Sequence, residues 1–462
     1  MRNQQASSGK RQDVGEVLVT GLSHDGRGLA RTQSASVNRA FGHRAGKTAR
    51  NKEQGKTLFI EGALPGETVT VRILEDRRRF LNGRVQTIIQ TSDERVEPPC
   101  KHFKQCGGCS LQYWSHKGQL AGKQEIVLDQ LRRFSSLVPV EVAPPLVSEP
   151  YGYRHRARLS IRWQKDGLAL GFREKQSKAI CSISECPVLS EPLRPLPELL
   201  RELLPQLQKH QAISHAELFD ADSGRAVLLR RIRPLTEQDA EALRDFARKE
   251  QLHLYLQGDP DRVHCLYKPR DDSWLYNQIP EFDLTLQFRP NDFTQVNWAI
   301  NRKMVAQAVE WLQPKPSDRV LDLFCGLGNF SLALARQVQT VTGVEGSEGA
   351  VERARHNAGL NRIKNCDFHQ ADLSALAKGN EWFNRDYDIL LLDPPRTGAI
   401  EIIEQMAQTL PDRVLYISCN PATLARDAGA LSEQGFQLAK LGVMDMFPQT
   451  AHVESMGLFI RS

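Results

Sequence analysis

The chain has 462 residues, of which 40% are hydrophobic and 25% charged, and it carries nine cysteines and a net charge of +6. This composition is typical of a globular protein of two to four domains. No apolar run approaches the roughly 20 residues that cross a bilayer, and Met1-Arg2-Asn3-Gln4-Gln5 contains no apolar signal-peptide core. An odd number of cysteines without an export signal favours metal ligands or catalytic groups over disulfides. We therefore predict a cytoplasmic protein that does not bind membranes.

Positive charge is concentrated near the N-terminus. Residues 1–80 contain 15 Lys and Arg against 8 Asp and Glu, so this segment carries +7 and all the rest of the chain carries −1. A basic segment on a near-neutral body indicates a polyanionic partner, most naturally a nucleic acid. Residues 1–12 taken alone are predicted to be a solvated basic tail.

Short alternating strands with glycine and proline turns occupy residues 13–90, a pattern that favours a small β-barrel. The turns are expected at Asp25-Gly26 and Pro65-Gly66. Residues 32–55 are rich in Ser, Asn, Arg, Lys and Gly, and we predict a disordered basic insertion there. The strands are expected at 15–20, 57–60, 68–74 and 84–89.

A central domain is expected over residues 91–290, and it shows no internal repeat. Its features are a basic strand at 153–162 and helices at 196–210 and 237–250. The second helix follows Thr236-x-x-Asp239, a capping-box-like signal. The basic strand is predicted either to contact phosphate groups or to be an ordinary exposed amphipathic strand.

Three cysteines of this domain have the spacing of a ligand group, Cys100-x5-Cys106-x2-Cys109. A fourth ligand must come from farther along the chain, and Cys181 and Cys186 are the candidates. Four thiolates suit an iron–sulfur cluster or zinc. Structural zinc sites usually use two short cysteine pairs and only one is present here, so the spacing favours iron–sulfur without deciding the fourth ligand.

From residue 291 to 462 strand-like and helix-like runs alternate, which predicts a doubly wound, mostly parallel α/β sheet. The last two strand-like runs, 436–444 and 452–460, are expected to form a β-hairpin at the sheet edge. The remaining strands are expected at 319–324, 340–344, 366–370, 387–392 and 413–417, and the helices at 330–336, 349–359, 400–409 and 423–431.

The first strand of this domain leads into Phe324-Cys325-Gly326-Leu327-Gly328-Asn329, a glycine turn that lets the backbone approach a ligand at a helix N-terminus. The third glycine of the dinucleotide fingerprint is replaced by Ser331, which disfavours NAD. Glu345 ends the second strand, where an acid can accept ribose hydroxyls, and Asp372 ends the third. This ordered set resembles the S-adenosylmethionine domain of class I methyltransferases.

Cys419 is expected between a strand and a helix that Asn420 or Thr423 caps. Helix N–H groups there can lower the pKa of a thiol, so Cys419 is a candidate nucleophile, with a buried structural cysteine as the alternative. Asp393-Pro394-Pro395-Arg396 ends the preceding strand. A thiolate added to carbon 6 of uracil would activate carbon 5 towards a methyl sulfonium. A base must then remove the proton from carbon 5, and Glu454 on the last strand is the candidate.

Several motifs together resemble the RNA uracil-5-methyltransferase family over nearly the whole chain: residues 322–330, Ser418-Cys419-Asn420-Pro421, Phe447-Pro448 and His452-x-Glu454-Ser455. By this resemblance Cys419 is the nucleophile and Glu454 the proton acceptor. Arg396 is expected to position Asp393 or the base. The resemblance implies that S-adenosylmethionine is bound by Gln295, Phe324, Asn329, Glu345, Asp372 and Asp393. Family members often have Asn in place of Asp372.

The resemblance also implies a fold: a seven-stranded class I methyltransferase domain, an OB-like TRAM barrel at 13–90, and a central α+β domain. That central domain would hold a [4Fe-4S] cluster on Cys100, Cys106, Cys109 and Cys186, with Cys181 not a ligand. Members with both barrel and cluster resemble this chain and act on uridine 1939 of 23S rRNA, so 23S rRNA is the expected partner. The protein is expected to be a monomer, and no protein partner is predicted. Dual-specificity members leave a second 23S rRNA site or tRNA as an alternative target. An iron–sulfur redox enzyme and a non-catalytic RNA-binding scaffold are disfavoured, because Cys419 and Glu454 would have no role.

Overall fold

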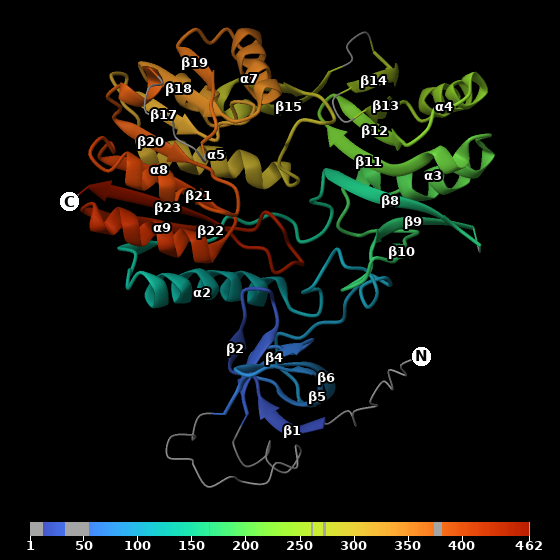
Figure 1. Cartoon of the computed structure of the whole chain (residues 1–462), viewed down its shortest axis with the longest axis horizontal. Helices are drawn as coiled ribbons and strands as arrows, with labels where there is room; N and C mark the ends of the chain where they lie inside the picture. The colour runs from blue at the N-terminus through green and yellow to red at the C-terminus, as the bar shows by residue number, and fades with distance from the viewer. Residues whose placement is uncertain are drawn as a thin grey trace, which may run out of the picture. The chain divides into compact units, whose positions relative to one another are not determined.

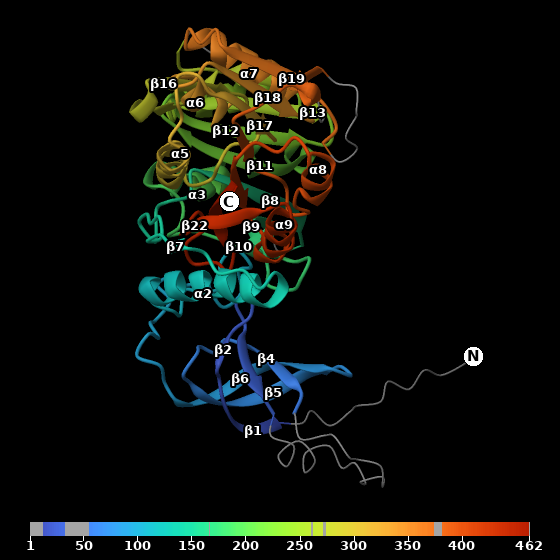
Figure 2. The ribbon, with the colours of Figure 1, turned by 90° about the vertical axis from the view of Figure 1, so that its left-hand side faces the viewer.

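A computed structural model of the chain describes residues 13–32, 55–165, 167–259, 262–270, 274–373 and 381–461. The expected tail at 1–12 and nearly all of the expected insertion at 32–55 lie outside the described residues. The chain divides into two compact units, which are described separately (Figures 1 and 2). Unit 1 is formed by Met1–Pro98, Ser110–Gly122 and Gln449–His452, and unit 2 by Pro99–Cys109, Lys123–Pro448 and Val453–Ser462. The domain boundaries expected at 90 and 290 stay predictions.

Unit 1 contains a six-stranded sheet with the order β1-β5-β6-β4-β3-β2. Side chains alternate between core and solvent along β4, where Leu58 and Ile60 are fully buried. Irregularities at three places in the β5·β6 ladder bend this pair and curl the sheet around its core. The expected turns are present, with Gly26 and Gly66 at φ +81° and +84°. The strands are β1 (Asp13–Leu18), β2 (Gly21–Leu22), β3 (Gly28–Arg31), β4 (Thr57–Glu61), β5 (Thr68–Asp76) and β6 (Phe80–Gln90).

Unit 2 contains a seven-stranded, mainly antiparallel sheet with the order β10-β9-β8-β11-β12-β13-β14. The two helices of this region pack on one face of the sheet (Figure 1). They are α3 (Leu196–Leu203) and α4 (Glu237–Lys249). The strands are β8 (Arg156–Gln164), β9 (Gly167–Arg173), β10 (Ile180–Ser182), β11 (Ile213–Ala221), β12 (Gly224–Arg231), β13 (His253–Asp259) and β14 (Arg262–Tyr267).

The two expected helices had different outcomes. α4 has the full capping box, in which Thr236 and Asp239 exchange hydrogen bonds. The helix expected over 196–210 was too long: it gives way after Leu203 to 3₁₀ turns, the first of which contains Pro205. A proline cannot donate the backbone hydrogen bond that continues an α-helix. The short 3₁₀ segments here are Glu191–Leu193, Leu204–Gln206 and His210–Ala212.

The C-terminal part of unit 2 is the predicted doubly wound sheet. Its order is β19-β18-β17-β20-β21-β23-β22-β7, with parallel pairing from β19 through β21. The strands are β7 (Glu141–Val142), β17 (Arg319–Leu323), β18 (Thr340–Glu345), β19 (Cys366–Gln370), β20 (Ile389–Leu392), β21 (Arg413–Ser418), β22 (Phe436–Met444) and β23 (Glu454–Arg461).

The predicted antiparallel pair of β22 and β23 is present, but neither strand is the edge. β23 lies between β21 and β22, and the short β7 pairs with β22 on its outer side. The sheet therefore has eight strands instead of seven. No pattern marks β7 in the sequence, because two residues are too few to show an alternation.

Helices cover both faces of this sheet (Figures 1 and 2). Successive residues of β21 show why: Leu415 and Ile417 belong to the core cluster with α5, α6 and α7, while Val414 and Tyr416 belong to the cluster with α2, α8 and α9. The helices are α2 (His116–Phe134), α5 (Trp298–Leu312), α6 (Ser331–Ala335), α7 (Glu348–Leu360), α8 (Ile400–Gln405) and α9 (Pro421–Glu433). A small hairpin of β15 (Leu275–Ile279) and β16 (Leu284–Phe288), with 3₁₀ turns at Pro280–Phe282 and Glu381–Asn384, completes the described elements.

None of the helices in the described ranges has both the length and the apolar character that crossing a membrane requires.

Candidate active site

The predicted site residues meet at one edge of the sheet. Glu345 is the last residue of β18, Asp393 directly follows β20, and Cys419 directly follows β21. Because these strands run parallel, their carboxyl ends lie along the same edge, where α/β sheets bind ligands.

The turn after β17 has the tight geometry that its glycines predict. Gly326 and Gly328 have φ angles of +55° and +89°, and Phe324 also adopts a positive φ, +66°. A non-glycine residue in this region costs about 1–3 kcal/mol. A Cβ placed on Gly326 would meet no atom within 4 Å, so the turn presents its backbone to open space.

Glu345 is held beside this turn by backbone N–H groups. Its Oε2 accepts from the N–H of Gly326 at 3.2 Å and its Oε1 from the N–H of Ser347 at 3.0 Å. Asn329 exchanges two 2.9 Å hydrogen bonds with Asn301 of α5. The acid is therefore fixed at the end of the second strand, partly exposed, where it can accept hydroxyl groups of a ribose.

Two of the predicted cofactor residues have solvent-accessible side chains. Asp372 follows β19 and is exposed, and Gln295 is partly exposed on the segment before α5. Their roles as cofactor ligands stay predictions.

Cys419 lies between β21 and α9, as predicted, and Asn420 is the helix cap. The Asn420 Oδ1 accepts from the N–H of Ala422 at 3.1 Å, and its Nδ2 donates to the carbonyl of Arg396 at 3.0 Å. One side chain thus connects the segment that carries Cys419 to the segment that follows Asp393.

The net pKa of Cys419 is raised, not lowered, although a backbone hydrogen bond contributes in the predicted direction. Burial, together with the carboxyl groups of Glu454 and Asp393, raises this pKa to about 11, and Arg396 only partly opposes the effect. Burial and the Asp393 charge also raise the pKa of Glu454 to about 8, against Arg396 and Lys123. Burial raises the pKa of Asp393 to about 7. The thiol and two carboxyl groups therefore form one electrostatic cluster, and the thiol is protonated at neutral pH.

A buried ion pair, which was not predicted from the sequence, lies near this cluster. Lys123 Nζ lies 2.7 Å from Asp445 Oδ1, and the two side chains are 1% and 0% exposed. The only sequence signal is that Lys123 precedes Val127 and Leu131 at four-residue spacing, on the buried side of α2. Because lysine is almost never fully buried unless it is paired, a lysine on the buried side of a helix indicates an ion-pair partner.

The four predicted cluster cysteines lie in two neighbouring segments. Cys100, Cys106 and Cys109 are on one loop, which the N–H of Gly107 joins to the carbonyl of Arg173 at 2.8 Å. Burial and then the thiols of Cys109 and, more weakly, Cys100 raise the pKa of Cys186 to about 12. Across the described ranges, no three or more His, Cys, Asp or Glu side chains converge as metal ligands do. The fully buried Cys181 lies next to Cys106.

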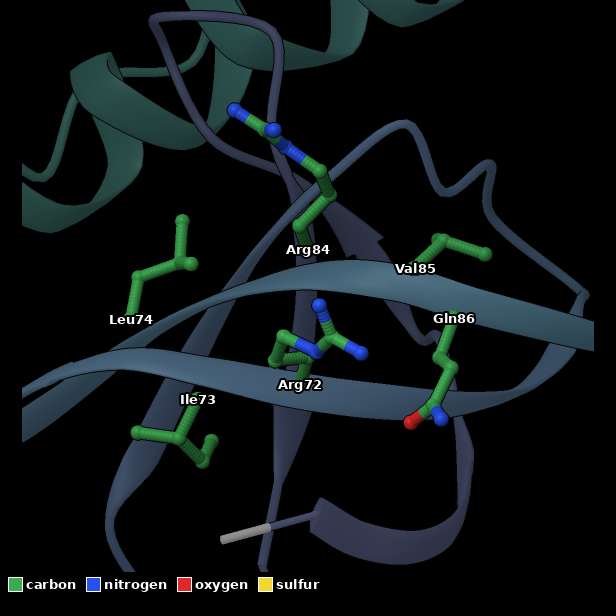
Figure 3. A pocket seen from close by; sticks show the side chains of 6 residues that line it. All are labelled: Arg72, Ile73, Leu74, Arg84, Val85 and Gln86. Carbon is green, nitrogen blue, oxygen red and sulfur yellow. The ribbon is translucent and has the colours of Figure 1, made fainter. Parts of the chain in front are cut away.

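A hollow of about 600 Å³ lies on the β5·β6 pair of unit 1 (Figure 3). Arg72 and Arg84 are directly opposite each other in this ladder, and Arg84 forms an ion pair with Glu61 at 2.8 Å. Like charges directly opposite each other on a sheet repel, so the hollow is suited to an anion. Its lining is Arg72, Ile73, Leu74, Arg84, Val85 and Gln86.

A doubly wound sheet with a glycine turn after its first parallel strand and an acid at the end of the second is shared by α/β folds that bind nucleoside cofactors, and the comparisons identify this one as an S-adenosylmethionine-dependent methyltransferase fold. The tRNA (Uracil-5-)-methyltransferase family model matches residues 115–462, and the TRAM domain model matches residues 10–86. The chain belongs to this family of RNA uracil-5-methyltransferases.

Relatives and a solved structure agree with this assignment. The 23S rRNA (uracil(1939)-C(5))-methyltransferase RlmD of Hahella chejuensis is 45% identical over 449 residues, 96% of each protein. The protein of the same name from Pseudomonas fluorescens (strain Pf0-1) is 43% identical over 98% of this chain and 93% of its own length. The Pyrococcus abyssi tRNA (uracil-54, C5)-methyltransferase shares the fold, with a TM-score of 0.69 and 22% identity over 96% of this chain and 100% of that one.

Proposed function

We propose that this protein transfers a methyl group from S-adenosylmethionine to carbon 5 of uridine 1939 in 23S rRNA. The observation that carries the proposal is the electrostatic cluster of Cys419, Glu454 and Asp393 at the carboxyl edge of a methyltransferase sheet. The target base follows from relatives that carry this activity in their names and are 43–45% identical over nearly the whole chain.

The residues of the glycine turn fit S-adenosylmethionine. The open space at Gly326 and the fixed carboxylate of Glu345 suit a nucleoside with free ribose hydroxyls. Phe324, Asn329, Gln295, Asp372 and Asp393 are the other proposed contacts. When bound, S-adenosylmethionine supplies an electrophilic methyl group on a sulfonium.

Cys419 performs the first step of the proposed reaction. Its Sγ gives its proton to solvent and forms a bond to carbon 6 of the uracil, and the electron pair of the carbon 5–carbon 6 double bond moves to leave an enolate nucleophilic at carbon 5. Because the pKa of the free thiol is about 11, the thiolate needs stabilisation, and Arg396 is the cation that favours it. A uridine inside folded RNA must be flipped out of its stack to reach this sulfur.

Glu454 performs the last step. After carbon 5 has been methylated, its carboxylate accepts the remaining proton on that carbon, and the electron pair released expels Sγ from carbon 6. A pKa near 8 suits this task, because such a carboxylate holds a proton firmly yet is partly ionised near neutral pH.

We also propose that Cys100, Cys106, Cys109 and Cys186 hold a [4Fe-4S] cluster. The support is chemical: four thiols are the donor set of such clusters. In the structure the thiols of Cys109 and Cys100 are near enough to Cys186 to raise its pKa. Methyl transfer needs no electron transfer, so we assign the cluster a structural role in shaping an RNA-binding surface.

The decisive experiment offers unmodified 23S rRNA and unmodified tRNA to the protein with labelled S-adenosylmethionine and maps the product by mass spectrometry. We expect 5-methyluridine at position 1939 of the rRNA alone. Product at a second rRNA site or in tRNA would establish the dual-specificity alternative. S-adenosylmethionine binding without product on either RNA would overturn the enzymatic proposal in favour of an RNA-binding scaffold.

A further inference from the structure

The seven-stranded sheet of unit 2 has one face covered by helices. On its other face Phe219 and Leu228 belong to a buried cluster with Leu275 of the β15·β16 hairpin, and the exposed part of that face, along β8 and β9, carries arginines. α3 and α4 pack on the covered face, against buried residues such as Leu159 and Leu218. Along β8 the residues between those buried positions point to the other face, and Arg158 and Arg162 among them are exposed. Figure 1 shows both helices on the same side of this sheet.

A single buried carboxylate organises the arginines. Glu217 on β11 is 5% exposed and lies 2.7 Å from Arg230, 3.3 Å from Arg156 and 3.8 Å from Arg158. These arginines come from β12 and β8, the strands on either side of β11. One carboxylate neutralises one guanidinium, so these three arginines and Glu217 together carry a net positive charge, although the Asp292 carboxylate also acts on Arg156.

Further cations adjoin this group. Arg173 on β9 is exposed, and its positive charge, like those of Arg158 and Arg230, lowers the pKa of His215. Burial, then these three positive charges, hold the pKa of His215 below its usual value despite Glu217. Arg158, Arg173 and Arg230 therefore lie close to His215, and Arg162 lies on the same side of β8 as Arg158. We call Arg156, Arg158, Arg162, Arg173 and Arg230, with Glu217 and His215, the arginine face; with His215 neutral its charge is +4.

We propose that the arginine face binds the sugar–phosphate backbone of the RNA substrate. This inference rests on the proposed function and adds a surface outside the methyltransferase sheet. Guanidinium groups bind phosphate through two parallel hydrogen bonds. Adjacent strands lie about 4.8 Å apart, so Arg158 and Arg230, two strands apart, can reach separate phosphates. Since backbone phosphates are alike in every sequence, this face contributes affinity and register and does not read bases.

One member of the arginine face connects it to the segment that carries Gln295. Arg156 donates to the carbonyls of Asp292 at 2.6 Å and Pro290 at 2.9 Å. That segment leads through Asn297, the N-cap of α5, whose side chain accepts from the N–H of Ile300 at 3.2 Å. The arginine face is thus hydrogen-bonded, through Arg156, to the segment that carries a predicted cofactor residue.

The test is the salt dependence of binding to an unmodified 23S rRNA fragment that spans position 1939. We compare the full-length protein with R158Q/R162Q, with the charge-keeping R158K/R162K, and with R248Q/K249Q. The last pair is exposed on α4, on the covered face, and is the matched control. Binding of S-adenosylmethionine and the thermal transition check that each variant is folded.

We expect R158Q/R162Q to reduce the slope of log K against log salt by about 1.5 and the affinity by roughly 30-fold at 0.1 M salt. R158K/R162K keeps most of the slope, and R248Q/K249Q keeps both slope and affinity. An unchanged slope in folded R158Q/R162Q, or an equal loss in R248Q/K249Q, overturns the proposal. If R158Q/R162Q lost binding to an acidic protein and kept its RNA binding, the ligand of this face would be a protein, and the proposal would also be overturned. Failure of the proposed methylation is seen separately, as absence of product from the unmutated protein.

Discussion

Lys123 and Asp445 form a buried ion pair that joins α2 to the segment after β22, 322 residues apart in the chain. The Lys123 Nζ also donates to the carbonyl of Phe447 at 3.0 Å. Burial lowers the pKa of Lys123, and Asp445 opposes this shift. The pair fixes the backbone that leads into the last strand, on which Glu454 is the first residue.

Replacing Lys123 with Met should therefore destabilise the protein by roughly 3–5 kcal/mol, because Asp445 is left as an uncompensated buried charge. Thermal or denaturant unfolding measures this loss. The double variant K123M/D445L removes both charges and should recover much of it. A double variant as unstable as the sum of the two single variants would show that the two residues do not interact.

Cys419→Ala should abolish methyl transfer and leave S-adenosylmethionine binding intact, because the variant lacks only the nucleophile. Product formation is measured with labelled donor and binding by calorimetry. Cys265→Ser, a half-buried thiol on β14, is the control and should keep full activity. Turnover by the Cys419→Ala variant would remove the nucleophile from the mechanism.

Glu454→Gln should slow product release by roughly 10²–10⁴-fold, the usual contribution of a general base. The thiol can still add and the base can still be methylated, so a covalent RNA–protein adduct should accumulate and be visible on a denaturing gel. Free RNA with normal product yield would contradict the role of Glu454 as the proton acceptor.

The pH profile gives an independent test of Glu454. Only its carboxylate accepts a proton, and its pKa is raised to about 8, so the rise of activity with pH should show an inflection near 8. E454Q should lack that inflection. The free energy of unfolding changes in the opposite direction. Because the pKa of this carboxyl is raised in the folded state, its ionisation lowers the free energy of unfolding as pH rises from 4.5 to 8. The stability of E454Q relative to the unmutated protein should therefore increase over that interval.

Cys186→Ser should lower the iron content from about four atoms per chain to nearly none, as expected for a four-thiolate cluster. Cys181→Ala should keep the iron, since Cys181 is proposed to be a buried neighbour of Cys106 and not a ligand. Iron and zinc are measured on anaerobically purified protein. Iron retained in the Cys186 variant but lost in the Cys181 variant would exchange their roles, and zinc in place of iron would refute the cluster type.

The local pattern of the sequence determined most of the methyltransferase domain. Alternating strands and helices, the glycine turn with its acid at Glu345, and the cap at Asn420 are short-range features whose geometry depends on neighbouring residues. The positions of Cys419 and Asp393 at one edge followed from the same pattern, because parallel strands end on the same side.

Tertiary structure decided what depends on burial and on distant partners. The high pKa of Cys419 arises because the fold brings two carboxyl groups beside it and removes water, and neither effect can be read from its helix alone. The Lys123–Asp445 pair, the insertion of β23 between β21 and β22, and the three arginines around Glu217 all join residues from separate strands or segments. Contacts of this kind leave no periodic trace in the sequence, since each partner looks ordinary until the chain places them together.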